Sequence, residues 1–391
     1  MRGSLFALAT LIILSAVSVA SPSQHKKPEK FPQQLDKGVV WQRDPATGEL
    51  HISTVDASGP TSETLKHGPA PLHALTQMVP VTCIVSAEDG EAVPGLRRDD
   101  FRIFDDSIAQ PIAYFDPSKQ PASVALVIDA SPSVLPDSGE MKQAAGALID
   151  SLAPLDQASV VDFSAHTYLL APFSDVREEI RRAVEHIDVR ALFGDTGGSN
   201  IYEAVYLTAE KLFAGRTGRK AIVLLTDGQD SGLGLTLDPW SESPHPGRAQ
   251  GRLTFDDVVR ALASQDIQVF AVSTENRPRV MTPEWLATNA DTGLISPNAL
   301  TLGIPAYTDY LAELVRRAGG QLYFLNESST VAGTFREIAE KIRAEYTLGF
   351  YPARAGGASA SPGWHKLRVE VVGHNGVTAS HRAAYYVPAT H

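Results

Sequence analysis

VALVIDASPS, residues 124–133, is the stretch of sequence that decides the fold of this chain. Its first half is an unbroken apolar run, which is typical of a central strand in a parallel sheet that is covered on both faces. Its second half places an aspartate and two serines directly after that strand, at Asp129, Ser131 and Ser133. In open α/β sheets, ligands bind just beyond the carboxyl ends of the strands. The stretch therefore predicts a doubly wound α/β domain with a polar site at one edge of its sheet.

Strand and helix patterns alternate after this stretch, which indicates βαβ units. Thr254 and Asp257 form a capping-box pattern before one predicted helix, and Ser174 is the expected N-cap of another. We predict an α/β fold over residues 120–345, with a doubly wound, mostly parallel, six-stranded, Rossmann-like sheet. Its strands are expected at residues 124–128, 159–163, 167–170, 221–226, 267–272 and 321–324.

Strand patterns without helices lie on both sides of the α/β region. Apolar residues alternate with polar ones within residues 79–119, and again within residues 346–391, where Asn375-Gly376 predicts a tight turn. We expect the C-terminal strands to pair with the N-terminal ones in a small β-rich unit. Residues 21–78 are polar and rich in proline, which predicts a linker that can contain a hairpin within residues 38–55.

The N-terminus has the features of a signal peptide over residues 1–20. Arg2 precedes an apolar run from Leu5 to Val17, and Ser18-Val19-Ala20 is a small-x-small cleavage pattern. The alternative is a retained anchor, although the apolar run is shorter than the ~20 residues that a membrane-spanning helix needs. We therefore expect a secreted or periplasmic protein with no stable membrane span after cleavage.

The composition indicates a soluble globular protein with a sizeable core. The chain has 391 residues, of which 43% are hydrophobic and 20% charged. A net charge of −11 argues against a nucleic-acid partner, because a binding surface for phosphates needs a basic patch. Cys83 is the sole cysteine, so no intramolecular disulfide can form. Its place in an alternating strand pattern predicts a buried thiol.

Two further segments place oxygen ligands at the same edge of the sheet as Asp129, Ser131 and Ser133. Asp227 follows a buried strand, and Ser199 follows two glycines at the start of a predicted helix. Mg²⁺ prefers about six oxygen ligands, which carboxylates, hydroxyls and water can supply. These five residues therefore predict a divalent-metal site, with Mg²⁺ as the expected ion and Mn²⁺ or Ca²⁺ as alternatives. Thr196 competes with Ser199 for its position, and the other interpretation is that these polar residues only cap turns and helices.

The order and spacing of these motifs resemble a known family. Asp129-x-Ser131-x-Ser133, Gly197-Gly198-Ser199 and Thr226-Asp227-Gly228 are similar to the metal-ion-dependent adhesion site of von Willebrand factor type A domains. The resemblance covers residues 123–344, with serine at position 199 where the family usually has threonine. The flanks, with Asp89-Gly90 before the domain and Tyr346-x-Leu348-Gly349-Phe350-Tyr351 after it, are similar to the exported bacterial VWFA-related acidobacterial-type group.

This resemblance implies a non-enzymatic module for binding proteins. The partner would present an acidic residue whose carboxylate fills the open coordination position of the metal. A structural or scaffold role in an exported assembly, with the metal used for stability, is the second hypothesis. A serine hydrolase is the third, with Ser131 or Ser133 as nucleophile and His166 as base, but the sequence contains no G-x-S-x-G elbow and no H-E-x-x-H helix.

Two insertions interrupt the α/β pattern, at residues 231–253 and 275–306. The first contains Trp240 and follows Asp227 directly, so we expect it to border the metal site. It is either an exposed loop or a rim that selects the partner.

Overall fold

The computed structural model describes residues 31–44, 48–54, 78–117, 120–132, 134, 138–187, 198–228, 230, 253–274, 280–281, 306–325, 331–352 and 361–388. All of them belong to the compact unit Phe31–His391. The predicted signal peptide, Ser133, Thr196, Trp240 and most of both insertions lie outside the described residues. None of the helices in the described ranges is long and apolar enough to cross a membrane.

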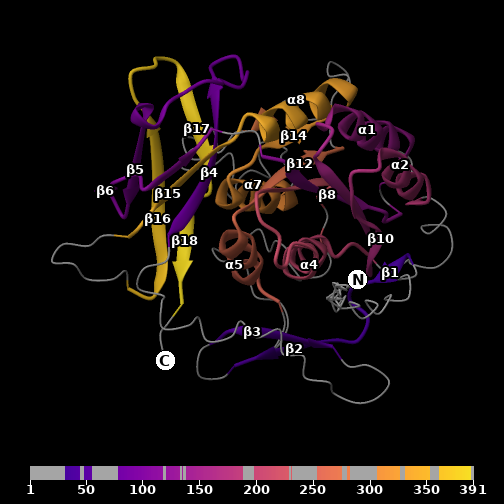
Figure 1. Ribbon diagram of the computed structural model, residues 1–391. Helices are drawn as coiled ribbons and strands as arrows, with labels where there is room; N and C mark the ends of the chain where they lie inside the picture. Colours follow the sequence, from indigo (N-terminus) through magenta and orange to yellow (C-terminus); the bar gives the residue numbers. More distant parts are fainter. Residues whose placement is uncertain are drawn as a thin grey trace, which may run out of the picture. The chain divides into compact units, whose positions relative to one another are not determined.

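An eight-stranded sheet forms the centre of the α/β domain, in the order β1-β10-β9-β8-β11-β12-β14-β13 (Figure 1). Its strands are β1 (Gln33–Gln34), β8 (Ala122–Asp129), β9 (Gln157–Phe163), β10 (Thr167–Ser174), β11 (Arg219–Thr226), β12 (Ile267–Ser273), β13 (Val280–Met281) and β14 (Leu322–Phe324). The six predicted strands are present, and all of them are parallel except β10, which runs antiparallel to β9. β1 and β13 are antiparallel two-residue strands at the two edges, which the sequence did not predict.

Helices cover both faces of this sheet, so the predicted doubly wound fold is confirmed. One face carries α1 (Ser138–Ser151), α2 (Arg177–Glu185) and α8 (Val331–Arg343). The other face carries α4 (Ile201–Leu207), its π-helical continuation Thr208–Leu212, α5 (Phe255–Gln265) and α7 (Ala306–Ala318). The side chains of β8 alternate between the two cores, because successive residues of a strand point to opposite faces.

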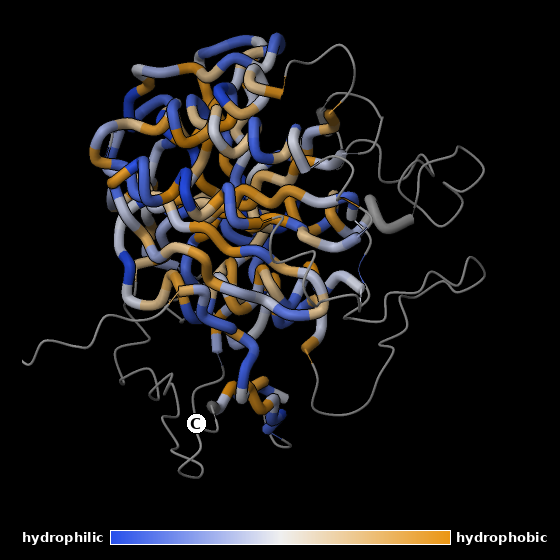
Figure 2. The backbone as a smooth tube through the Cα atoms, turned by 90° about the vertical axis from the view of Figure 1, so that its right-hand side faces the viewer, coloured by the Kyte–Doolittle hydropathy of each residue, from blue (hydrophilic) through white to orange (hydrophobic). Residues whose placement is uncertain are grey.

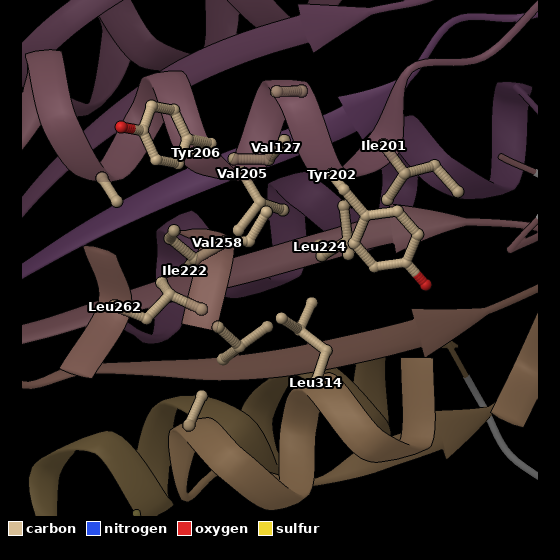
Figure 3. Close-up of a cluster of buried hydrophobic side chains, with 14 of the residues drawn as sticks. Val127, Ile201, Tyr202, Val205, Tyr206, Ile222, Leu224, Val258, Leu262 and Leu314 are labelled. Carbon is tan, nitrogen blue, oxygen red and sulfur yellow. The ribbon is translucent and has the colours of Figure 1, made fainter. Parts of the chain in front are cut away.

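Each of the two cores is a cluster of buried hydrophobic side chains. Figure 3 shows Val127 of β8 together with Ile222 and Leu224 of β11 among side chains of the covering helices, including Tyr202 of α4 and Val258 of α5. Figure 2 shows the hydrophobic stretches of the chain gathered in the interior and hydrophilic stretches toward the outside. This distribution is what hydrophobic burial requires of a domain without disulfides.

Of the two helix N-termini predicted from the sequence, one agrees with the structure and the other does not. The capping box of Thr254 and Asp257 is confirmed at the start of α5. The prediction of Ser174 as a helix N-cap is wrong, because β10 extends to that residue and Val176 is the N-cap of α2. The Ser174 hydroxyl still accepts from the backbone N–H of Val176 at 3.1 Å, so it stabilises the turn before the helix instead.

Two four-stranded sheets built from both flanks pack around a core of their own. The first has the order β17-β4-β15-β7 and the second β18-β16-β5-β6. The N-terminal flank supplies β4 (Val79–Ala87), β5 (Phe101–Asp105), β6 (Ile108–Gln110) and β7 (Tyr114–Asp116), and the C-terminal flank supplies β15 (Tyr346–Phe350), β16 (Gly363–Val371), β17 (Val377–His381) and β18 (Ala384–Val387). Strands of opposite flanks pair directly, β15 and β17 with β4 and β16 with β5. Cys83 of β4 is fully buried in this core, as predicted.

The hairpin that the sequence allowed at residues 38–55 of the polar segment is present, and it contacts the α/β domain. β2 (Val39–Arg43) and β3 (Leu50–Thr54) pair as a hairpin, and apolar side chains of both strands pack against the α4–α5–α7 core. The Trp41 ring lies 5.4 Å from that of Tyr206 in α4, and Arg43 pairs with Asp257 of α5 at 2.8 Å. Alternating apolar residues in a polar stretch therefore dock this segment on the α/β domain.

Candidate metal centre

The carboxyl ends of β8 and β11 meet at the point where the strand order reverses. β8 has β9 on one side and β11 on the other, and the chain leaves β8 toward α1 and reaches β11 from α4. This is the topological switch point at which open α/β sheets bind their ligands. Asp129 is the last residue of β8, and Asp227 directly follows β11.

Asp129 is the centre of a buried hydrogen-bond network. Its Oδ1 accepts from the backbone N–H of Ser131 at 2.9 Å, which folds the loop back over the strand end. Its Oδ2 accepts from the hydroxyls of Ser199 at 3.1 Å and Thr226 at 2.6 Å. Three segments that are far apart in the sequence are thus joined by one carboxylate.

The loop that carries Ser199 is held in place by hydrogen bonds to a neighbouring turn, so that the Ser199 side chain reaches this carboxylate. Gly198 adopts a φ of 106°, a conformation that favours glycine, and α4 begins two residues after Ser199. The next residue, Asn200, donates from its backbone N–H to Ser164 O at 2.8 Å and from its amide to Ala165 O at 2.7 Å. The turn between β9 and β10 therefore holds the Ser199 loop in place.

Burial and negative charge dominate the electrostatics of the site. The pKa of Asp129 is raised to about 6, mainly by burial; hydrogen bonds with Ser131 and Thr226 lower it, and the neighbouring Asp227 adds to the rise. Asp227 itself is only 7% exposed. Two carboxylates so close together in a poorly hydrated place are costly when both are ionised, and a bound cation offsets that cost.

The chemistry of the side chains brought together here fits Mg²⁺. Asp129, Ser131, Ser199 and Asp227 are all buried and all offer oxygen atoms, which hard cations prefer over nitrogen or sulfur. The structure therefore places four of the five predicted residues together, and the fifth, Ser133, lies outside the described residues. Their roles as metal ligands stay predictions.

Thr226 is also a member of the network, although the sequence indicated it only as part of the Thr226-Asp227-Gly228 motif and not as a site residue. Its hydroxyl donates to Asp129 and accepts from the backbone N–H of Gly228 at 3.0 Å. It therefore links the carboxylate of one strand to the loop that carries Asp227. A hydroxyl at the last position of a buried apolar strand, immediately before an aspartate, was the available signal.

His166 lies in the turn between β9 and β10, the same turn that holds Asn200. Its Nδ1 is 2.6 Å from the carboxylate of Asp36, which resembles the histidine and orienting aspartate of the hydrolase hypothesis. The hydroxyls of Ser131 and Ser199, however, bond to Asp129. Ser131 is therefore part of the Asp129 network, and Ser133, the other nucleophile of that hypothesis, lies outside the described residues.

The fold and the all-oxygen site define a class of domain that binds ligands at the carboxyl edge of its sheet. The family model of the von Willebrand factor type A domain matches residues 123–282. The chain therefore contains a von Willebrand factor type A domain, and such domains commonly mediate metal-dependent protein interaction and are generally not enzymes. The predicted family is confirmed, whereas the narrower exported bacterial group stays a prediction.

Several solved structures are similar to this chain. BatB from Bacteroides thetaiotaomicron is 15% identical with a TM-score of 0.39, over 56% of this chain and 98% of that chain. A von Willebrand factor type A protein from Catenulispora acidiphila is 14% identical with a TM-score of 0.38, over 81% of this chain and 75% of that chain. Proximal thread matrix protein 1 from the mussel byssus, with a zinc-occupied MIDAS motif, is 14% identical with a TM-score of 0.37, over 59% and 47%. No curated protein matches the chain significantly.

Proposed function

We propose that this protein is a metal-dependent protein-binding module whose partner presents an acidic side chain. The observation that carries the proposal is the convergence of Asp129, Ser131, Ser199 and Asp227 at the switch point of the sheet. A divalent cation, Mg²⁺ as the best fit, would be held by these residues and by Ser133, and it would supply positive charge for an incoming carboxylate. The protein's own hydrogen bonds orient the ligand oxygens beforehand, so little entropy is lost on binding.

Displayed peptides and purified protein test this proposal. Peptides selected in Mg²⁺ are expected to carry Asp or Glu, and to lose binding in chelator or when their acid is changed to its amide. The Asp227→Asn variant is expected to lose both Mg²⁺ binding in calorimetry and peptide binding. Asp99→Asn, which removes an exposed carboxylate in the flanking β unit, is the matched control and should bind normally.

Two outcomes would overturn the proposal. One is peptide binding that is equal in Mg²⁺ and in chelator. The other is a rise in Tm with Mg²⁺, as mass action requires of any bound ion, without any effect of the metal on partner binding. The second result would favour the structural role, in which the metal only stabilises the domain.

We also propose that the protein acts outside the cytoplasm, on the strength of the signal-peptide pattern in residues 1–20. N-terminal sequencing of protein recovered from the periplasm or medium should then begin at Ser21. An intact Met1 on the exported protein would contradict cleavage at this site.

A further inference from the structure

A second group of metal-ligating side chains lies in the β-rich unit, outside the site described above. It consists of Asp105 at the end of β5, Asp106 in the turn that follows, and His365 in β16. One ligand atom from each side chain lies within 4.8 Å of the others. Asp105 is completely buried and His365 is 4% exposed, whereas the Asp106 side chain is 40% exposed, so two of the three side chains lie inside the β-rich unit.

Hydrogen bonds from residues outside the group orient each of the three side chains. His365 Nε2 lies 2.6 Å from the carbonyl oxygen of Ser361, and Asp106 Oδ1 accepts from the backbone N–H of Lys366 at 2.8 Å. Asp105 Oδ2 accepts from the hydroxyl of Tyr385 at 3.0 Å. Metal-binding histidines typically donate their second N–H to a carbonyl or carboxylate in this way.

The remaining ligand atoms face one another across a narrow gap. His365 Nδ1 lies 2.7 Å from Asp106 Oδ2 and 4.0 Å from Asp105 Oδ1. Because the Ser361 carbonyl can only accept, the hydrogen of a neutral ring is on Nε2, and the Nδ1 lone pair then points at carboxylate oxygen. That arrangement is repulsive, and a positive charge between these atoms would relieve the repulsion.

Such a positive charge is either a proton on Nδ1 or a metal ion. A proton there makes a hydrogen bond to Asp106 only, since 4.0 Å to Asp105 exceeds hydrogen-bond distance. A metal ion can contact all three atoms, and it matches the orientation that Ser361, Lys366 and Tyr385 impose on them.

We propose that Asp105, Asp106 and His365 bind a divalent transition-metal ion, with zinc as the best fit. One imidazole and two carboxylates form a ligand set that zinc accepts, with a fourth position for water, whereas Mg²⁺ favours oxygen alone. The ion fastens the turn after β5, from the N-terminal flank, to β16 of the C-terminal flank. This site is separate from the proposed partner-binding site, and neither proposal depends on the other.

Zinc titration of the full chain in the Asp227→Asn background tests the proposal, because that change weakens the first site. One equivalent of zinc is expected to bind and to raise Tm. Asp106→Asn should weaken zinc binding by at least about tenfold, since it replaces a direct ligand. Asparagine tolerates the left-handed backbone at this position, where φ is 46°. Asp99→Asn, with the same change in charge in the same β unit, should bind zinc normally.

X-ray absorption at the zinc edge tests whether zinc is bound through the His365 imidazole, and it does so even if Asp106→Asn does not fold. In the Asp227→Asn protein the spectrum should show one imidazole, with ligands at about 2.0–2.2 Å. A ligand shell without imidazole, equal zinc affinity in Asp106→Asn and Asp99→Asn, or no binding at one equivalent would each overturn the proposal. The last result would mean that a proton fills the gap.

Discussion

Thr226 controls the geometry of the metal centre more than its place in the sequence suggests. It is completely buried, and its single hydroxyl both donates to Asp129 and accepts from Gly228. An apolar side chain of the same shape would leave the Gly228 N–H without this partner and remove the shortest hydrogen bond to Asp129 Oδ2.

Thr226→Val is therefore expected to lower the free energy of unfolding by about 1–3 kcal/mol, the usual cost of a buried polar group that loses its partner. It should also weaken Mg²⁺ binding, because Asp129 is less firmly oriented. Urea denaturation and calorimetry measure the two effects. Thr226→Ser keeps the hydroxyl and should stay close to wild type, and a Thr226→Val protein of unchanged stability and Mg²⁺ affinity would show that the network does not orient Asp129.

The sequence predicted which oxygen-bearing side chains come together at the site better than it predicted the contacts that hold them. Asp129 and Asp227 could be found because each directly follows a buried strand, and Ser199 because glycines precede it. The roles of Thr226 and Asn200 depend on which strands are neighbours and on the turn between β9 and β10. Such information lies in the tertiary structure and not in any local pattern.

Among the elements, α7 ends where it contacts both β12 and the β-rich unit. Gly319 has a φ of 87° and terminates the helix, and a Cβ on it would lie 2.4 Å from the backbone N of Arg382. A Cβ on Gly320 would lie 1.9 Å from the carbonyl oxygen of Val269 in β12. The second contact is with the backbone of a central strand, which has little freedom to move.

Gly320→Ala should consequently destabilise the protein by about 1–3 kcal/mol or more, as overpacking of a close-packed interior does. The matched control is Gly139→Ala near the start of α1, where a Cβ would meet nothing within 4 Å. That change should be neutral or stabilising by up to about 1 kcal/mol, because alanine favours the helix. Equal melting temperatures for the two variants would contradict this account of the α7–β12 contact.

Long periodic elements were predictable, and short or docked ones were not. The buried strands and amphipathic helices have local patterns that determine their type. β1 and β13 have only two residues each, too few to show any period. The hairpin of β2 and β3 was recognised as a local feature, but its docking depends on Tyr206 and Asp257, which lie far along the chain.

In the whole molecule, buried charges occupy the junction between the α/β domain and the β-rich unit. Arg382, between β17 and β18, pairs with Asp266 at 3.6 Å and donates to the backbone oxygens of Ala263 and Pro80. Thr82 of β4 donates to the same aspartate at 2.6 Å. These contacts join strands of both flanks to the segment between α5 and β12, so the two parts should unfold together.

Glu345 lies between α8 and β15, at the point where the chain passes from the α/β domain into the β-rich unit. It is 3% exposed, and neither of its oxygens has a hydrogen-bond partner among the described residues. Burial raises its pKa well above the ordinary value, Arg219 opposes the rise, and Asp266 and Asp156 add to it. Cys83 also lies close enough to interact with it.

This raised pKa makes the stability of the protein depend on pH. Above about pH 4.3, the ordinary pKa of glutamate, the unfolded chain releases a proton that the folded protein keeps. The contribution of Glu345 to the free energy of unfolding is therefore fully present below that pH. It falls as the pH rises toward the folded pKa, by at most about 1.4 kcal/mol per pH unit for this one group.

A glutamine at position 345 tests this dependence, because it has the same shape as glutamate and cannot ionise. Glu345→Gln should thus match the wild type near pH 4 and exceed it by a growing margin as the pH rises above about 4.3 toward the folded pKa. Urea denaturation over this range measures the difference, and a constant difference would mean that Glu345 titrates normally in the folded protein.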